Sequence, residues 1–172
     1  DDFNVTSFES TERVLPSYVI ESLRQHHYTF SIVGKKALDH FSQDISAEHT
    51  VSGIHDLDNR RIVVSDTSAV VVLHEIGHFV SCSFQKVKGE NLTQTKEWRE
   101  IYNSEKSKYV SKTDFERVKD VYAATSPNEF FAECFQQYYL AQNTLAKNCP
   151  KAYSFIQRTM TKDFPQISGT LW

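Results

Sequence analysis

Hydrophobic positions in the first third of the chain change from helical to strand-like spacing. After Pro16, apolar residues recur at helical spacing, which predicts a helix over about residues 16–26. The alternating run 28–33 is rich in β-branched and aromatic residues and predicts a strand. Residues 36–41 predict one short helical turn.

A β-hairpin and an apolar helix are predicted next. The strand-like runs 50–55 and 61–65 flank residues 56–59, which are mostly turn formers. The Ser, Asp and Thr residues at 65–68 favour a helix N-terminus, and the apolar stretch behind them predicts a helix over about residues 69–83.

The rest of the chain is predicted to be mainly helical. Helices are expected over about residues 93–108, 115–122, 126–140 and 150–160. Residues 1–10 are expected to be a loose lead-in. This order of elements predicts an α+β fold with a small mixed sheet near the N-terminus, and 172 residues suit one domain over residues 1–172.

Composition narrows the possible partners. A formal net charge of −3 gives no electrostatic reason to expect a nucleic acid or a membrane surface as partner. No apolar run reaches the roughly 18 residues that suggest a membrane span. The three cysteines, Cys82, Cys134 and Cys149, lack metal-site spacing, and we expect small buried thiols rather than a disulfide framework.

The predicted apolar helix contains the sequence His74-Glu75-Ile76-Gly77-His78. Residues four apart lie on one helix face, so both imidazoles can reach one zinc ion while Glu75 points at its water. Zinc needs neutral imidazole ligands and an open position, and a carboxylate beside the water can take its proton. About 0.02 such matches are expected by chance in this composition. Two histidines on a helix without metal are the alternative.

A catalytic zinc needs a third protein ligand, and no His follows His78 in the sequence. Glu129 and Glu133 lie four residues apart on a predicted helix whose flanking aromatics indicate burial. A buried carboxylate is costly unless it meets a metal or a partner. We expect one of the two to bind metal and the other to accept the second ring N–H of a ligand His. The spacing leaves open which does which, and a solvated acidic stripe is the alternative.

The motif 74–78, together with Tyr122 and the Glu-Phe-Phe-Ala-Glu run 129–133, resembles the anthrax lethal factor family of zinc metallopeptidases. Within that family the chain is similar to the small secreted Pro-Pro endopeptidases of clostridia. The similarity covers about residues 15–160. It implies a zincin-like metallopeptidase fold of the gluzincin type, one zinc per chain, and secretion.

The resemblance also implies roles for the acidic residues. His74, His78 and Glu129 are then the zinc ligands, Glu133 supports a ligand His, and Glu75 is the general base.

Three further residues receive roles from the resemblance alone. Tyr122 would donate a hydrogen bond to the oxyanion of the tetrahedral intermediate, whereas packing alone predicts a core aromatic. Ser52 and Gly53 would belong to an edge strand that pairs with an extended substrate. Asn128 is a departure, because the clostridial enzymes carry a second Glu there.

These residues predict a zinc endopeptidase that cleaves an extended protein or peptide substrate, with selectivity for proline left open. No residue pattern indicates an oligomeric state, and a monomer is assumed. A catalytically inactive, protease-like binding domain is an alternative that the intact residue set disfavours. A second alternative is a zinc amidase that acts on a cell-wall substrate. The strand suited to extended peptides weighs against this alternative.

Overall fold

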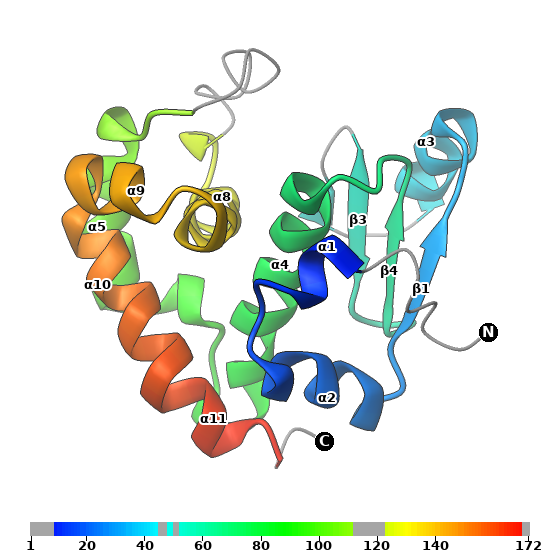
Figure 1. Ribbon diagram of the computed structural model, residues 1–172, viewed down its shortest axis with the longest axis horizontal. Coiled ribbons are helices and arrows are strands. Elements are labelled where there is room, and N and C mark those ends of the chain that lie inside the picture. The colour runs from blue at the N-terminus through cyan, green and yellow to red at the C-terminus, as the bar shows by residue number, and fades with distance from the viewer. Residues whose placement is uncertain (1–8, 45–47, 50–51, 112–122, 170–172) are drawn as a thin grey trace.

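The computed structural model describes residues 9–44, 48–49, 52–111 and 123–169 (Figure 1). A small sheet lies on one side and a group of helices on the other, with helix α4 (Ala69–Lys88) between them. This arrangement confirms the predicted α+β fold with a mainly helical C-terminal half.

The sheet has four strands in the order β1-β4-β3-β2. Strand β1 pairs with β4 in parallel, and the other two pairs are antiparallel, so the sheet is mixed as predicted. The strands are β1 (Thr29–Ile32), β2 (Glu48–His49), β3 (Gly53–Asp56) and β4 (Arg61–Val64).

Strand β2 was not foreseeable from hydrophobic alternation, because it has only two residues and both are polar. It changes one expectation. The prediction that the strand containing Gly53 forms the sheet edge is wrong over Ile54 and His55, because β2 pairs with both of these residues.

The N-terminal helices agree with the sequence in place but not always in length. The predicted helix 16–26 is α2 (Ser17–Gln25). A short helix α1 (Glu9–Glu12) includes the last two residues of the expected lead-in 1–10, whose other residues lie outside the described ranges. The single predicted turn at 36–41 is a longer helix, α3 (Lys35–Asp44). Helix α4 runs five residues past its predicted end, since Phe84 is still buried in the core.

The C-terminal half is a succession of short helices. They are η2 (Leu92–Gln94), α5 (Lys96–Glu105), η3 (Lys106–Lys108), α8 (Pro127–Leu140), α9 (Gln142–Asn148), α10 (Pro150–Arg158), the π-helical turn η4 (Thr159–Asp163) and α11 (Phe164–Ile167). Helix α8 begins as its Ser126-Pro127 start predicts, with the Ser126 hydroxyl accepting from the Glu129 amide at 3.1 Å. The predicted helix over 115–122 lies outside the described residues.

The core surrounds α4, which packs against β3 and β4 on one side and α8 on the other. Large side chains with almost no exposure fill it: Phe79, Trp98, Phe130, Phe131, Phe135 and Phe164. The carboxylate of Glu105 is also buried and accepts from the first amides of α10, at 3.0 Å from Lys151 and 2.9 Å from Ala152. This contact fastens α5 to α10 through a helix cap.

No disulfide joins the three cysteines to one another, and all three lie in the described ranges. Cys134 and Cys149 are buried as predicted, whereas Cys82 is only partly buried. No helix in the described part of the chain has both the length and the apolar character that a membrane span requires.

Candidate metal centre

Helix α4 presents its two motif histidines side by side. His74 and His78 are one helical turn apart, and their Nε2 atoms lie 3.2 Å from each other. Both rings have about 1% of their surface exposed, and Glu75 has none. The sheet and α8 cover the helix on either side, so very little of the motif is exposed to solvent.

Glu129 of α8 completes the cluster. Its Oε2 lies 2.9 Å from Nε2 of His74, and its Oε1 lies 3.6 Å from Nε2 of His78. One ligand atom from each of these three residues falls within 4.8 Å of the others, and no other such metal-capable group occurs in the described ranges. The structure thus brings together the three residues that the resemblance implied as ligands.

The geometry distinguishes the two glutamates that spacing alone left equivalent. Glu129 faces the Nε2 atoms of both histidines, whereas Oε1 of Glu133 lies 2.9 Å from Nδ1 of His74. Glu133 therefore meets the ring nitrogen that points away from the cluster, which is where a carboxylate can hold the imidazole tautomer.

Tyr109 adds a partner that sequence reasoning missed. Its buried hydroxyl lies 3.2 Å from Oε2 and 3.3 Å from the main-chain oxygen of Glu133, and it donates to this residue. The hydroxyl thus connects to His74 through the Glu133 carboxylate. No motif marks Tyr109, which follows the polar run Lys106–Lys108, so only the folded arrangement reveals it.

Close packing between α4 and α8 makes this convergence possible. A Cβ atom placed on Gly77 would lie 3.1 Å from Cα of Ala132 and 3.2 Å from Cβ of Phe135. Because Gly77 has no side chain, the two helices approach closely in the middle of the motif. At this helix separation, Glu129 and Glu133 of α8 can reach the histidines of α4.

The electrostatics of the cluster favour a positive charge. Burial alone lowers the pKa of His74, but the carboxylates of Glu129 and Glu133 outweigh it and raise the pKa to about 9. For Glu129, burial raises the pKa, but His74 and His78 outweigh it and hold the pKa well below its usual range. In a site with these donors, a divalent cation can take the place of the proton on Nε2.

The donor set fits zinc in geometry as well as in charge. Ligands at about 2.0–2.1 Å in a tetrahedron stand about 3.3 Å from one another. The two Nε2 atoms are 3.2 Å apart, close to that value, and the Glu129 carboxylate brings Oε2 to 2.9 Å from His74 and Oε1 to 3.6 Å from His78. Three protein ligands leave a fourth position for water.

Of the remaining predicted site residues, the structure describes Ser52 and Gly53, whereas Tyr122 lies outside the described residues. The Ser52 carbonyl accepts from the Ser65 amide at 2.8 Å, so the backbone of Ser52 faces β4, and that of Gly53 faces the opposite side. A substrate-pairing role for Ser52 and Gly53 therefore stays a prediction.

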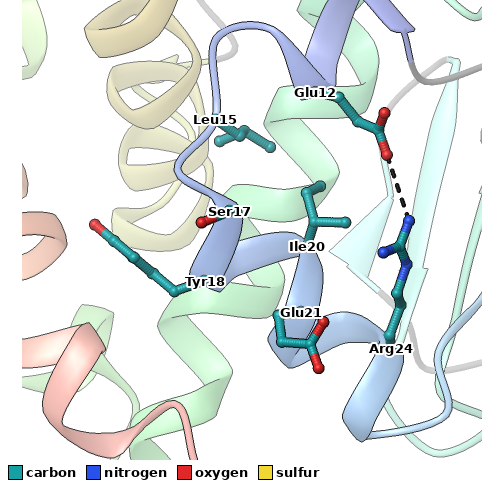
Figure 2. A pocket seen from close by; sticks show the side chains of 7 residues that line it. All are labelled: Glu12, Leu15, Ser17, Tyr18, Ile20, Glu21 and Arg24. Carbon is teal, nitrogen blue, oxygen red and sulfur yellow. Dashed lines mark ion pairs between the residues drawn. The ribbon is translucent and has the colours of Figure 1, made fainter.

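A separate hollow lies over α1 and α2 and has a volume of about 670 Å³ (Figure 2). None of the predicted site residues lines it. Glu12 and Arg24 lie at one edge of it and form an ion pair at 3.6 Å. With this charge pair satisfied internally, the hollow offers no chemistry comparable to that of the histidine cluster.

Comparison with known proteins agrees with the geometry. Residues 34–159, well over half of the chain, match the family model described as anthrax toxin lethal factor, N- and C-terminal domain. The chain belongs to this family. Among solved structures, it is similar to the Pro-Pro endopeptidase from Paenibacillus alvei, with a TM-score of 0.57 and 15% sequence identity over 92% of this chain and 93% of that one. Comparison with curated protein sequences finds no match.

Proposed function

We propose that this protein is a zinc-dependent endopeptidase. The observation that carries the proposal is the convergence of His74, His78 and Glu129 within 4.8 Å in a buried site, with Glu75 on the same helix. Membership in the lethal factor family and the Pro-Pro endopeptidase fold support it.

In this proposal His74, His78 and Glu129 hold one zinc ion. Bound zinc would supply a Lewis acid and a water of lowered pKa. The Glu133 carboxylate, 2.9 Å from Nδ1 of His74, would accept a hydrogen bond from Nδ1–H, which leaves the Nε2 lone pair available to the metal. Tyr109 keeps the Glu133 carboxylate in place through its hydrogen bond.

Glu75 is the proposed general base. Its carboxylate takes a proton from the attacking water and passes it to the leaving amine nitrogen. Its complete burial excludes bulk water, which strengthens its interaction with charge that develops in the site. Tyr122 is proposed as the hydrogen-bond donor to the oxyanion, on the basis of the family resemblance alone.

The substrate is proposed to be an extended peptide with proline near the cleaved bond. The solved relative is a Pro-Pro endopeptidase, and its fold covers nearly the whole chain. Asn128 stands beside the proposed ligand Glu129, where the clostridial enzymes carry a second Glu, so the selectivity of this protein is expected to differ in detail. Secretion remains a prediction from the family resemblance, and a monomeric state remains an assumption.

Peptide profiling tests the proposal. The zinc-loaded protein should cleave members of a combinatorial peptide library, with enrichment of proline around the cleaved bond, and a chelator should stop the cleavage. The Glu75→Ala variant is the matched control for a contaminating protease. If the parent and this variant cleave alike, or if neither cleaves any peptide while cell-wall amides are hydrolysed, the proposal is wrong.

A further inference from the structure

Gly53 is the first residue of β3 and lies on the sheet face that α4 covers. The next residue, Ile54, packs into a small separate cluster on the other face, and His55 faces the ring of Phe79 on α4 at 6.5 Å. Side chains alternate along a strand, so position 53 points toward α4 as His55 does.

The residue spacing along α4 matches the residue spacing along β3. Glu75 and Phe79 are four residues apart on α4, a rise of about 6 Å. Gly53 and His55 are two residues apart on β3, a distance of about 6.7 Å. Phe79 lies over His55, and Glu75 therefore lies over Gly53.

The space that a side chain would need at position 53 is taken by the Glu75 carboxyl group. A Cβ atom placed on Gly53 would lie 2.7 Å from Oε1, 2.9 Å from Cγ and 3.0 Å from Cδ of Glu75. Favourable contacts between such atoms are about 3.5–4.0 Å long. Glu75 is fully buried, and α4 is held between the sheet and α8, so its carboxylate would have to change position.

We propose that Gly53 is a positioning residue for the general base. The missing side chain at position 53 sets where the Glu75 carboxylate lies relative to the proposed zinc site. This inference rests on the proposed function, in which Glu75 takes the proton of the attacking water. It differs from a substrate-pairing role, because a positioning residue affects kcat and a substrate contact affects KM.

The test compares Gly53→Ala with Gly34→Ala, a matched control at a glycine whose added Cβ would meet no atom within 4 Å. A misplacement of about 1 Å at a catalytic group can reduce turnover about 10²-fold. We expect Gly53→Ala to lose kcat on this scale, with KM and zinc content close to those of the parent, and Gly34→Ala to change none of them. A kcat within about threefold of the parent, or a change in KM alone, overturns the inference.

A second arm does not depend on activity. Melting temperatures of the parent, Gly53→Ala, Glu75→Ala and the double variant form a double-mutant cycle. Gly53→Ala should lower the melting temperature of the parent by several degrees but hardly lower that of Glu75→Ala, where the crowded side chain is gone. Equal losses in both backgrounds show that position 53 does not act through Glu75. A parent that cleaves no peptide refutes the proposed function and a catalytic role for Gly53, while the cycle still tells whether the contact exists.

Discussion

Replacing Tyr109 by Phe removes one hydroxyl from the chain of contacts that leads to His74. That hydroxyl is 3.2 Å from Oε2 of Glu133, whose Oε1 is 2.9 Å from Nδ1 of His74. A hydrogen bond to a charged group contributes about 1.5–3 kcal/mol. Changes to groups that orient a ligand His typically weaken metal affinity by about 10–100-fold. Because Tyr109 acts through Glu133, we expect a loss of about tenfold in zinc affinity, which is about 1.4 kcal/mol.

Competition with a chromophoric chelator measures the zinc Kd of the variant directly. Tyr153→Phe is the matched control, since the hydrogen bonds of the Tyr153 hydroxyl within the described part of the chain come from the side-chain amides of Gln142 and Gln157, away from the histidine cluster. The control should keep the Kd of the parent, and Glu133→Ala should weaken binding more than Tyr109→Phe does. The reasoning is refuted if Tyr109→Phe binds zinc as tightly as the parent while Glu133→Ala does not.

Three other predictions can be tested, the first drawn from the family resemblance and the other two from the structure. Tyr122→Phe should lower kcat by about 10²–10³-fold with zinc content unchanged, and a kcat within threefold would return this residue to a packing role. Metal-free protein should lose stability as pH rises from 6.5 through about 9, because the raised pKa of His74 stabilises the fold only while the ring is protonated. Melting temperatures of the parent and His74→Ala, measured across this pH range, test the prediction. An equal dependence of melting temperature on pH in both proteins contradicts it. Glu105→Ala should lower the free energy of unfolding in urea by about 1–3 kcal/mol, since two buried amides of α10 lose their acceptor, and unchanged zinc content would separate this effect from the metal site.

The sequence predicted those elements whose signals are local. The helix that carries the motif, the hairpin after Gly53 and the Ser126-Pro127 helix start follow from periodicity and capping, and all are present in the fold. The resemblance to the lethal factor family is confirmed by the family match. Strand β2 escaped because two polar residues carry no alternation, and its pairing is decided by the sheet it joins.

The candidate site shows a similar division. Helical spacing was enough to place His74 beside His78, and burial of the aromatic helix was enough to suggest Glu129 and Glu133. Which glutamate faces the Nε2 atoms depends on how α8 crosses α4, a long-range feature that spacing does not contain. The contact of Tyr109 with Glu133 joins residues 24 positions apart and has the same origin.

Close packing was equally invisible in the sequence. Gly53 could be read as a residue of a substrate strand, but its contact with Glu75 depends on the register of α4 over β3. The sequence assigns no role to Gly77 inside the motif, whereas in the structure α4 packs closely against Ala132 of α8 at this residue.

The most direct test of the central claim is the zinc content of three purified proteins: the parent, Glu75→Ala and Glu129→Ala. Metal analysis should find about one zinc per chain in the parent and in Glu75→Ala, since Glu75 acts on protons and is not a ligand. Glu129→Ala should lose most of its zinc, because it removes the carboxylate that faces both Nε2 atoms. Full zinc in Glu129→Ala together with its loss from Glu75→Ala would contradict the account.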